Sequence, residues 1–246
     1  MKFNKLSGAD PEGESSAMRG HILLEGGAEF GGQMAAADMR AIELAGGLDA
    51  RVCIIPAAAA PDNNHQQAGH NGVRWFKYLG ARQATLLPLI DHTSANQYSI
   101  ATSLRNSRLI YLLGGFPHYL EQTLAGSLSW QAIIEAYQAG AVIAGSSAGA
   151  MVLCQHYYNL GTGSVIDGLN LIPKACIIPH HNTSGKDWGP HLVALLPEDV
   201  IIGIDEQTGM IDDGADGKWN IYGKGFVARY KDGKVESYHP GETFSL

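Results

Sequence analysis

Short apolar runs alternate with segments of helical length along the chain after residue 20. The runs lie at 21–25, 51–55, 84–89, 108–113, 141–144, 175–179 and 200–204. The segments between them have helical patterns and lie at 34–45, 66–79, 95–105, 117–124, 129–138 and 148–157. Strands that are apolar throughout, separated by helices, are typical of a parallel sheet covered on both faces.

This alternation predicts an α/β fold, with three layers (α/β/α) around a mostly parallel, flavodoxin-like sheet. The last part of the chain differs, because residues 219–237 predict two or three short antiparallel strands, with a turn at residues 231–234 closing a C-terminal β-hairpin. Residues 1–20 are small and polar and predict a loosely ordered lead-in. We find no repeat and no linker, so residues 21–246 are expected to form a single domain.

Composition narrows the class of protein. The 246 residues are 45% hydrophobic and 17% charged, and the net charge of −7 comes without a basic run, so nothing indicates a nucleic-acid partner. The three cysteines, Cys53, Cys154 and Cys176, are widely spaced in apolar sequence, which indicates reduced, buried residues. No apolar run reaches the roughly 18 residues of a membrane span, and the N-terminus has no apolar targeting segment. We therefore expect a cytoplasmic protein that does not bind membranes.

The segment AGSSAGAM, residues 144–151, is the first candidate for chemistry. Gly145, Ser147 and Gly149 satisfy the G-x-S-x-G pattern between an apolar strand and an apolar helix, the context of a nucleophile elbow. Small neighbours suit a sharp turn, and the amides at the helix N-terminus face the site where negative charge would develop. The pattern also fits an ordinary glycine-rich turn, or an anion-binding loop without a reaction. Ser147, rather than Ser146, is the centred residue.

A nucleophilic serine needs a base, and the base needs an orienting partner. His180 and His181 directly follow the apolar run 175–179, at the end of a strand where α/β sites form. They also fit ordinary loop residues, or a metal site with His191. Without a carboxylate cluster or a recognisable ligand spacing, we expect no metal.

The third group and the oxyanion donors come from other strand ends. Asp205 and Glu206 end the apolar run 200–204 and offer a carboxylate, although acidic residues there often only cap a turn. The oxyanion of an acyl transfer needs backbone donors, which we assign to the amide of Ala148 and to the Gly-Gly pair at 114–115. The order Ser, His, acid differs from that of the α/β-hydrolases.

Taken together, the sequence resembles the peptidase S51 family, which contains cyanophycinases and aspartyl dipeptidases. The resemblance covers nearly the whole chain after residue 20, and its segments are LLEGGAEFG, RVCIIPAAAAP, IYLLGGFPHYL, AGSSAGAM and IGIDEQTGM. It implies a fold shared with class I glutamine amidotransferase-like proteins. It also implies a homodimer, because family members are often dimers.

The resemblance assigns roles to single residues. It implies Ser147 as nucleophile, His180 as base and Glu206 as the partner of that base, with Gly115 and Ala148 as oxyanion donors. Two features depart from the cyanophycinases. The sequence around the histidine, IPHHNTS, lacks their Asp-Gln before it and the arginines after it, whereas its Pro-His matches the dipeptidases. Phe116 stands where a polar residue usually follows the Gly-Gly pair.

We therefore predict a serine hydrolase that cleaves amide bonds of a small peptide or isopeptide without a cofactor. An aspartyl or β-aspartyl substrate is an option that the resemblance adds. Two alternatives remain: a non-catalytic protein that binds a small ligand on the same fold, and a glutamine-amidotransferase-like subunit. The latter normally carries a cysteine where this chain has Ser147.

Overall fold

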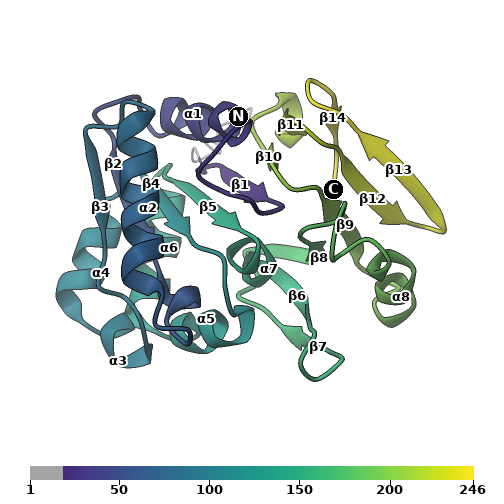
Figure 1. Ribbon diagram of the computed structural model, residues 1–246, viewed down its shortest axis with the longest axis horizontal. Coiled ribbons are helices and arrows are strands. Elements are labelled where there is room, and N and C mark those ends of the chain that lie inside the picture. Colours follow the sequence, from purple (N-terminus) through teal and green to yellow (C-terminus); the bar gives the residue numbers. More distant parts are fainter. Residues whose placement is uncertain (1–18) are drawn as a thin grey trace, which may run out of the picture.

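The structure is a computed structural model that describes residues 19–246 (Figure 1). The lead-in predicted for residues 1–20 lies outside the described residues up to residue 18. Gly20 is already part of the fold, since its N–H donates to the carbonyl of Tyr137 at 2.8 Å.

Within residues 19–246, eight strands form the larger of two sheets. The order across it is β14-β11-β10-β1-β5-β4-β2-β3. The part from β1 to β3 is parallel, and the part from β1 to β14 is antiparallel. The strands are β1 Ile22–Glu25, β2 Arg51–Ile55, β3 Gln83–Leu86, β4 Leu109–Leu112, β5 Val142–Ser146, β10 Thr208–Ile211, β11 Trp219–Gly223 and β14 Thr243–Phe244.

Six further strands of the described region form a second sheet, in the order β13-β12-β9-β8-β6-β7. They are β6 Cys154–Asn159, β7 Ser164–Asp167, β8 Ile172–Ile178, β9 Val200–Ile204, β12 Val227–Lys231 and β13 Lys234–Tyr238. The strands β6, β8 and β9 run parallel, and the outer pairs are antiparallel. The α/β fold class is confirmed. The apolar runs at 175–179 and 200–204, which we expected in a single sheet, belong to this second one because they pair with each other and with β6 and β12.

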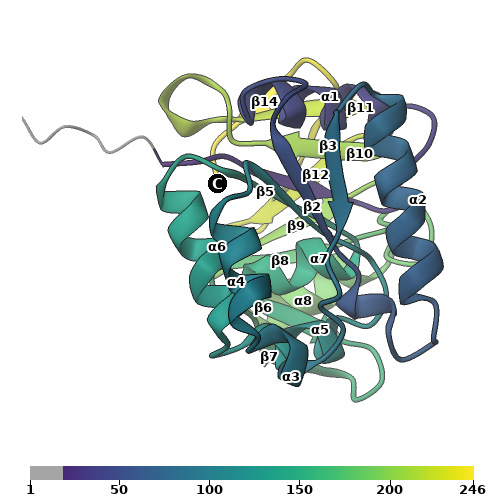
Figure 2. The ribbon, with the colours of Figure 1, turned by 90° about the vertical axis from the view of Figure 1, so that its left-hand side faces the viewer.

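Helices cover both faces of the larger sheet (Figure 2). The α-helices of residues 19–246 are α1 Met34–Leu44, α2 His65–Tyr78, α3 His92–Ala95, α4 Tyr98–Arg105, α5 Pro117–Leu124, α6 Leu128–Gln138, α7 Ala148–Leu153 and α8 Trp188–Leu195. Of these, α8 packs on β9 and β12 of the second sheet. Helices α1 and α2 pack over one face, where Leu23, Ile54 and Phe76 belong to one buried cluster. The largest cluster takes residues from the other face, from α4 and α6, and from the second sheet, so the two sheets share a core.

The helix expected over residues 148–157 is shorter than predicted. Helix α7 ends at Leu153, and Cys154 is already extended with φ −76° and ψ 166°. The next residues, CQHYYN, form β6 between β8 and β7, with Cys154 and Tyr157 buried and the other four residues partly buried. Tyrosines favour such a half-buried pleated surface, and here strand pairing prevails over the apolar helical pattern of the preceding residues. His156 consequently lies on a strand.

The C-terminal part follows the antiparallel pattern expected for residues 219–237. Strands β12 and β13 pair in register, with Lys231 opposite Lys234. The two residues between them, Asp232 and Gly233, have φ of 52° and 72°, as a tight hairpin turn requires.

The three cysteines are free and buried.

Candidate active site

Ser147 lies at the sharp junction between β5 and α7. Its φ of 49° and ψ of −109° place a non-glycine residue in a sparsely populated region, as expected for a serine displayed on a strained turn. The flanking glycines are sterically required. A Cβ on Gly145 would lie 2.5 Å from the carbonyl carbon of Gly149, and one on Gly149 would lie 2.2 Å from the carbonyl oxygen of Leu112. The turn thus depends on direct contact between main chains.

A continuous chain of polar atoms connects Ser147, His180 and Glu206. Ser147 Oγ lies 3.0 Å from Nε2 of His180, and Nδ1 of His180 lies 2.8 Å from Oε1 of Glu206. The histidine and glutamate side chains are 30% and 35% exposed, so the pair opens to the surface. The hydrogen bond from His180, helped by one from Thr183, holds the pKa of Glu206 below its usual value against a weaker effect of burial.

The end of β1 holds all three segments that carry these residues. Three consecutive carbonyls, those of residues 25–27, each accept one main-chain hydrogen bond from a different segment. The bonds are Ser147 N–H to Glu25 O at 3.0 Å, His180 N–H to Gly26 O at 2.7 Å and Gln207 N–H to Gly27 O at 3.0 Å. The larger and the smaller sheet therefore meet at this point, and the spacing of the side chains is fixed by the backbone.

The neighbouring residues that the sequence left as alternatives point elsewhere. Ser146 is buried, and its hydroxyl donates to Oε2 of Glu29 at 2.9 Å. His181 is buried too, with Nε2 2.8 Å from the hydroxyl of Tyr230 and Nδ1 3.4 Å from Oδ1 of Asp205. The other oxygen of Asp205 accepts the N–H of Phe226 at 3.1 Å. His181 and Asp205 therefore bond each other and their own neighbours, and neither they nor Ser146 take part in the contacts of Ser147.

The two backbone groups expected to bind an oxyanion lie beside Ser147. Ala148 is the first residue of α7, where an N–H has no partner within the helix. Gly115 lines the same cavity as Ser147 and has φ of 137°, and a Cβ there would lie 2.3 Å from the carbonyl oxygen of Ala58. Across residues 19–246, neither amide donates a hydrogen bond to the protein.

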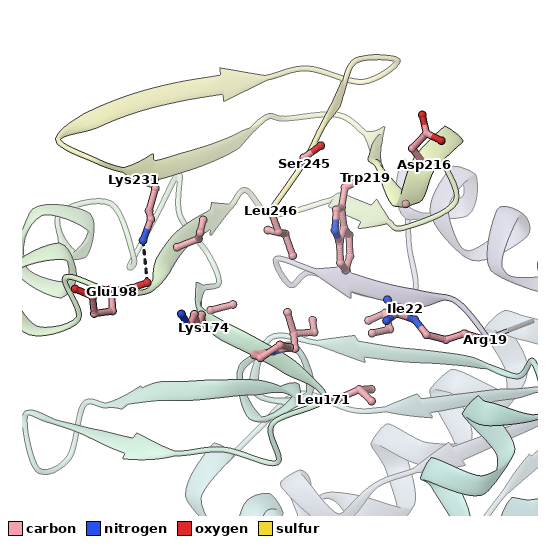
Figure 3. Close-up of a pocket in the computed structure, with 15 residues that line it drawn as sticks. Arg19, Ile22, Leu171, Lys174, Glu198, Asp216, Trp219, Lys231, Ser245 and Leu246 are labelled. Atoms are coloured by element: carbon pink, nitrogen blue, oxygen red, sulfur yellow. Dashed lines mark hydrogen bonds between the residues drawn. The ribbon is translucent and has the colours of Figure 1, made fainter. Parts of the chain in front are cut away.

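A cavity of about 390 Å³ opens over Ser147 and His180. A larger one, of about 710 Å³, lies at the other end of the sheets (Figure 3). It contains Ile22 at the amino end of β1, while Ser147 is held by the carboxyl end of that strand. Figure 3 shows two residues of its lining, Lys231 and Glu198, joined by a hydrogen bond from Nζ of the lysine to the glutamate carbonyl, at 2.8 Å. Ser147 is not among the residues that line this larger cavity.

Within the described part of the chain, no group of three or more His, Cys, Asp or Glu side chains is arranged to hold a metal ion. His191, the third member of the metal alternative, packs its ring 5.7 Å from that of Tyr158.

A buried acidic pair beneath the site was not expected from the sequence. Glu25 and Asp38 are both fully buried, and Glu25 accepts a hydrogen bond from the hydroxyl of Tyr111. Asp38 accepts the indole N–H of Trp75 at 2.7 Å. Burial raises the pKa of Glu25 well above its ordinary value and that of Asp38 to about 7. The signal available in the sequence was a carboxylate directly following the apolar residues HILL.

Known proteins resemble this chain over most of its length. The model of Peptidase family S51 matches residues 22–217. A cyanophycinase of Thermosynechococcus vestitus is 26% identical over 225 residues, which cover 87% of this chain and 69% of that protein. A cyanophycinase of Geminocystis herdmanii is 28% identical over 232 residues, covering 90% and 84%.

Two solved structures are similar as well. A peptidase from an acI-B1 Actinobacterium superposes with a TM-score of 0.84 at 30% identity, over 94% of this chain and 98% of that one. A putative peptidase E from Listeria monocytogenes shares the fold, with a TM-score of 0.56 at 20% identity, over 87% and 98%. Among residues 19–246, no helix has both the length and the apolar character needed to cross a membrane. The chain belongs to peptidase family S51 and is a serine-type peptidase.

Proposed function

We propose that this peptidase hydrolyses amide bonds of small peptides with Ser147 as nucleophile, His180 as base and Glu206 as the partner of the base. The observation that carries the proposal is the unbroken chain from the serine hydroxyl through the imidazole to the carboxylate, with steps of 3.0 and 2.8 Å. Nucleophile, base and orienting group within hydrogen-bond reach are the geometric signature of covalent catalysis.

In the first half-reaction, Ser147 Oγ attacks the carbonyl carbon of the substrate while Nε2 of His180 accepts the hydroxyl proton. The carbonyl oxygen becomes an oxyanion, to which the amides of Ala148 and Gly115 donate. The imidazolium then gives its proton to the nitrogen of the leaving amine, and the C–N bond breaks. In the second half-reaction a water molecule, deprotonated by His180, attacks the acyl-enzyme and releases the carboxylic acid product and the free serine.

Glu206 accepts the hydrogen on Nδ1 of His180, which leaves Nε2 free to accept the serine proton. Because its pKa is lowered, the carboxylate keeps its negative charge and stabilises the imidazolium that forms. Thr183 donates its hydroxyl to the same oxygen of Glu206 at 3.2 Å, and Asn182 accepts the N–H of Glu206 at 3.0 Å. These contacts support a fixed carboxylate.

An aspartyl or β-aspartyl peptide is a second candidate substrate, favoured by the likeness to cyanophycinases. A homodimer is a further proposal, which sedimentation analysis of the purified chain tests.

The test is labelling with a fluorophosphonate probe, together with hydrolysis of a dipeptide panel that includes β-aspartyl peptides. Wild type is expected to be labelled, and Ser147→Ala is expected to be neither labelled nor active. Ser146→Ala is the matched control, because its hydroxyl bonds Glu29 instead of His180. It is expected to keep most of the labelling and activity. An unlabelled, inactive wild type would favour a protein that only binds its ligand.

A further inference from the structure

The cavity over Ser147 has walls that are mostly apolar and aromatic. Its volume is about 390 Å³, within the range of small-molecule sites. The apolar and aromatic residues among those that line it are Phe116, Pro117, Met151, Tyr158, Leu160, Pro179 and Trp188. Ser147 and His180 belong to the same lining, so the cavity begins at the reacting atoms. A substrate side chain next to the scissile bond would enter it.

One wall is an aromatic pair held in place from behind. The rings of Tyr158 and Trp188 meet edge to face with centroids 5.5 Å apart. Both pack against a buried cluster that includes Ile178 and Leu192. Tyr158 lies on β6 of the second sheet, and Trp188 is the first residue of α8, the helix that packs on this sheet. Regular secondary structure therefore positions both rings. The wall is therefore preformed.

The rim of the cavity exposes large apolar side chains. Leu160 is 64% exposed and Phe116 is 43% exposed. Both line the cavity, one from the loop between β6 and β7 and the other from the segment before α5. Both side chains contact water in the free protein. An apolar ligand that covers them would remove this apolar surface from water, which favours binding.

No side chain in the lining carries a permanent charge. An arginine or aspartate side chain placed there would lose water without gaining an ion pair, which is unfavourable. The nearest charged residues along the chain, Lys186 and Asp187, are exposed and outside the lining. The carboxylate of Glu206 is already bonded to His180 and Thr183.

We propose that this cavity is the subsite for an apolar, preferably aromatic, side chain adjacent to the scissile bond, so that the enzyme selects apolar over charged residues at that position. The inference rests on the proposed function, since it places the subsite beside Ser147 as nucleophile. It differs from the aspartyl candidate, which requires a cation in the same place.

The test compares dipeptides of the forms X-Ala and Ala-X, with Phe, Leu, Ala, Arg or Asp as X. At one of the two positions, Phe and Leu are expected to exceed Ala in kcat/KM by at least roughly 10-fold, and Arg and Asp to fall below Ala. Where a dipeptide is not cleaved, its binding is measured as slower fluorophosphonate labelling of Ser147. Higher values for Arg or Asp than for Phe at both positions would overturn the proposal.

Leu160→Glu adds a carboxylate to the exposed rim and leaves the core untouched. It is expected to lower the ratio of kcat/KM for the Phe dipeptide to kcat/KM for the Arg dipeptide by about 10-fold (about 1.4 kcal/mol). Leu48→Glu makes the same change at a residue that is 45% exposed and outside the cavity, and its ratio is expected to equal that of wild type. An unchanged ratio in Leu160→Glu contradicts the subsite. If wild type is labelled at Ser147 but prefers charged substrates, the subsite alone is rejected. If wild type is neither labelled nor active, the proposed function is rejected as well.

Discussion

Gly149→Ala is expected to reduce stability and activity together, because α7 touches β4 through its main chain. The added Cβ would lie 2.2 Å from the carbonyl oxygen of Leu112 and 2.9 Å from its carbonyl carbon. Ordinary carbon–oxygen contacts begin at about 3.3 Å. The helix and the strand would therefore have to separate by about 1 Å, and neither contact is to a flexible side chain that could move instead.

The size of both effects follows from this displacement. Overpacking a buried contact typically costs about 1–3 kcal/mol, and a backbone clash belongs at the upper end of that range. For a chain of this length, about 3 kcal/mol corresponds to a fall in Tm of roughly 6–12 °C. Ser147 immediately precedes α7, so it moves with the helix. A misplacement of about 1 Å can cost on the order of 10²-fold in rate, and we expect kcat/KM to fall by about that factor.

Urea unfolding, thermal unfolding and dipeptide hydrolysis measure these effects. Gly31→Ala is the matched control, since Gly31 has ordinary φ and a Cβ there meets nothing within 4 Å. It is expected to match wild type in both stability and rate. Wild-type stability and activity in Gly149→Ala would refute the steric argument, and equal losses in both variants would attribute them to the glycine backbone instead of to Leu112.

The other predictions concern charge and protons. Glu206→Gln is expected to lower kcat by about 10⁴-fold with an unchanged unfolding curve, whereas Asp205→Asn should act mainly on stability; a larger loss of kcat in Asp205→Asn would reverse the assignment. The value of kcat/KM is expected to fall as the pH decreases, because a protonated His180 cannot accept the serine proton while Glu206, whose pKa is lowered, stays ionised; a flat profile between about pH 5 and 8 would remove His180 as base. Asp38, whose pKa is raised from 3.8 to about 7, binds its proton more tightly in the folded state, so its contribution to stability is complete below about pH 4 and is lost as the pH rises to about 7. Asp38→Asn should flatten the pH dependence of urea unfolding in that window by about 1 kcal/mol per pH unit, and an unchanged slope would contradict this.

The α/β fold class and most strands of the N-terminal half could be predicted, because each of these strands is a short apolar run that can be recognised from its own residues. Within the apolar runs 51–55 and 108–113, residues 52–55 and 109–113 are buried, so these runs stand out in the sequence without knowledge of their partners. The candidate site could be predicted for the same reason. Residues that directly follow buried strands gather where the carboxyl ends of the two sheets meet, and His180 lies within hydrogen-bond reach of both Ser147 and Glu206.

The features that could not be predicted depend on which segments pair or pack together, and the pattern of residues within one segment does not contain that information. The sequence predicts a helix that continues into β6, because CQHYYN has no apolar–polar alternation and becomes a strand only through its pairing with β7 and β8. The separation into two sheets follows from which strand edges pair, and the apolar residues 175–178 of β8 and 200–204 of β9 would have the same pattern in either sheet. The aromatic wall of the cavity was missed with β6, since Tyr158 and Trp188 meet only after the second sheet has formed.

The Gly-Gly pair at 26–27 enters the sequence analysis only within the segment LLEGGAEFG of the family resemblance, and the structure gives it a larger role. A Cβ on Gly26 would lie 2.2 Å from the carbonyl oxygen of Asp205, and a Cβ on Gly27 would lie 2.3 Å from Cε1 of His180. Side chains are thus excluded where the carbonyls of Gly26 and Gly27, directly after β1, bind the segments that carry the histidine and the glutamate. The strained φ of Ser147 and the φ of 50° at His180 are both held by N–H groups bonded to this strand end. The geometry that the proposed mechanism needs is therefore set by the three backbone carbonyls of residues 25–27, at the end of β1 and directly after it, and the side chains of the proposed triad depend on it.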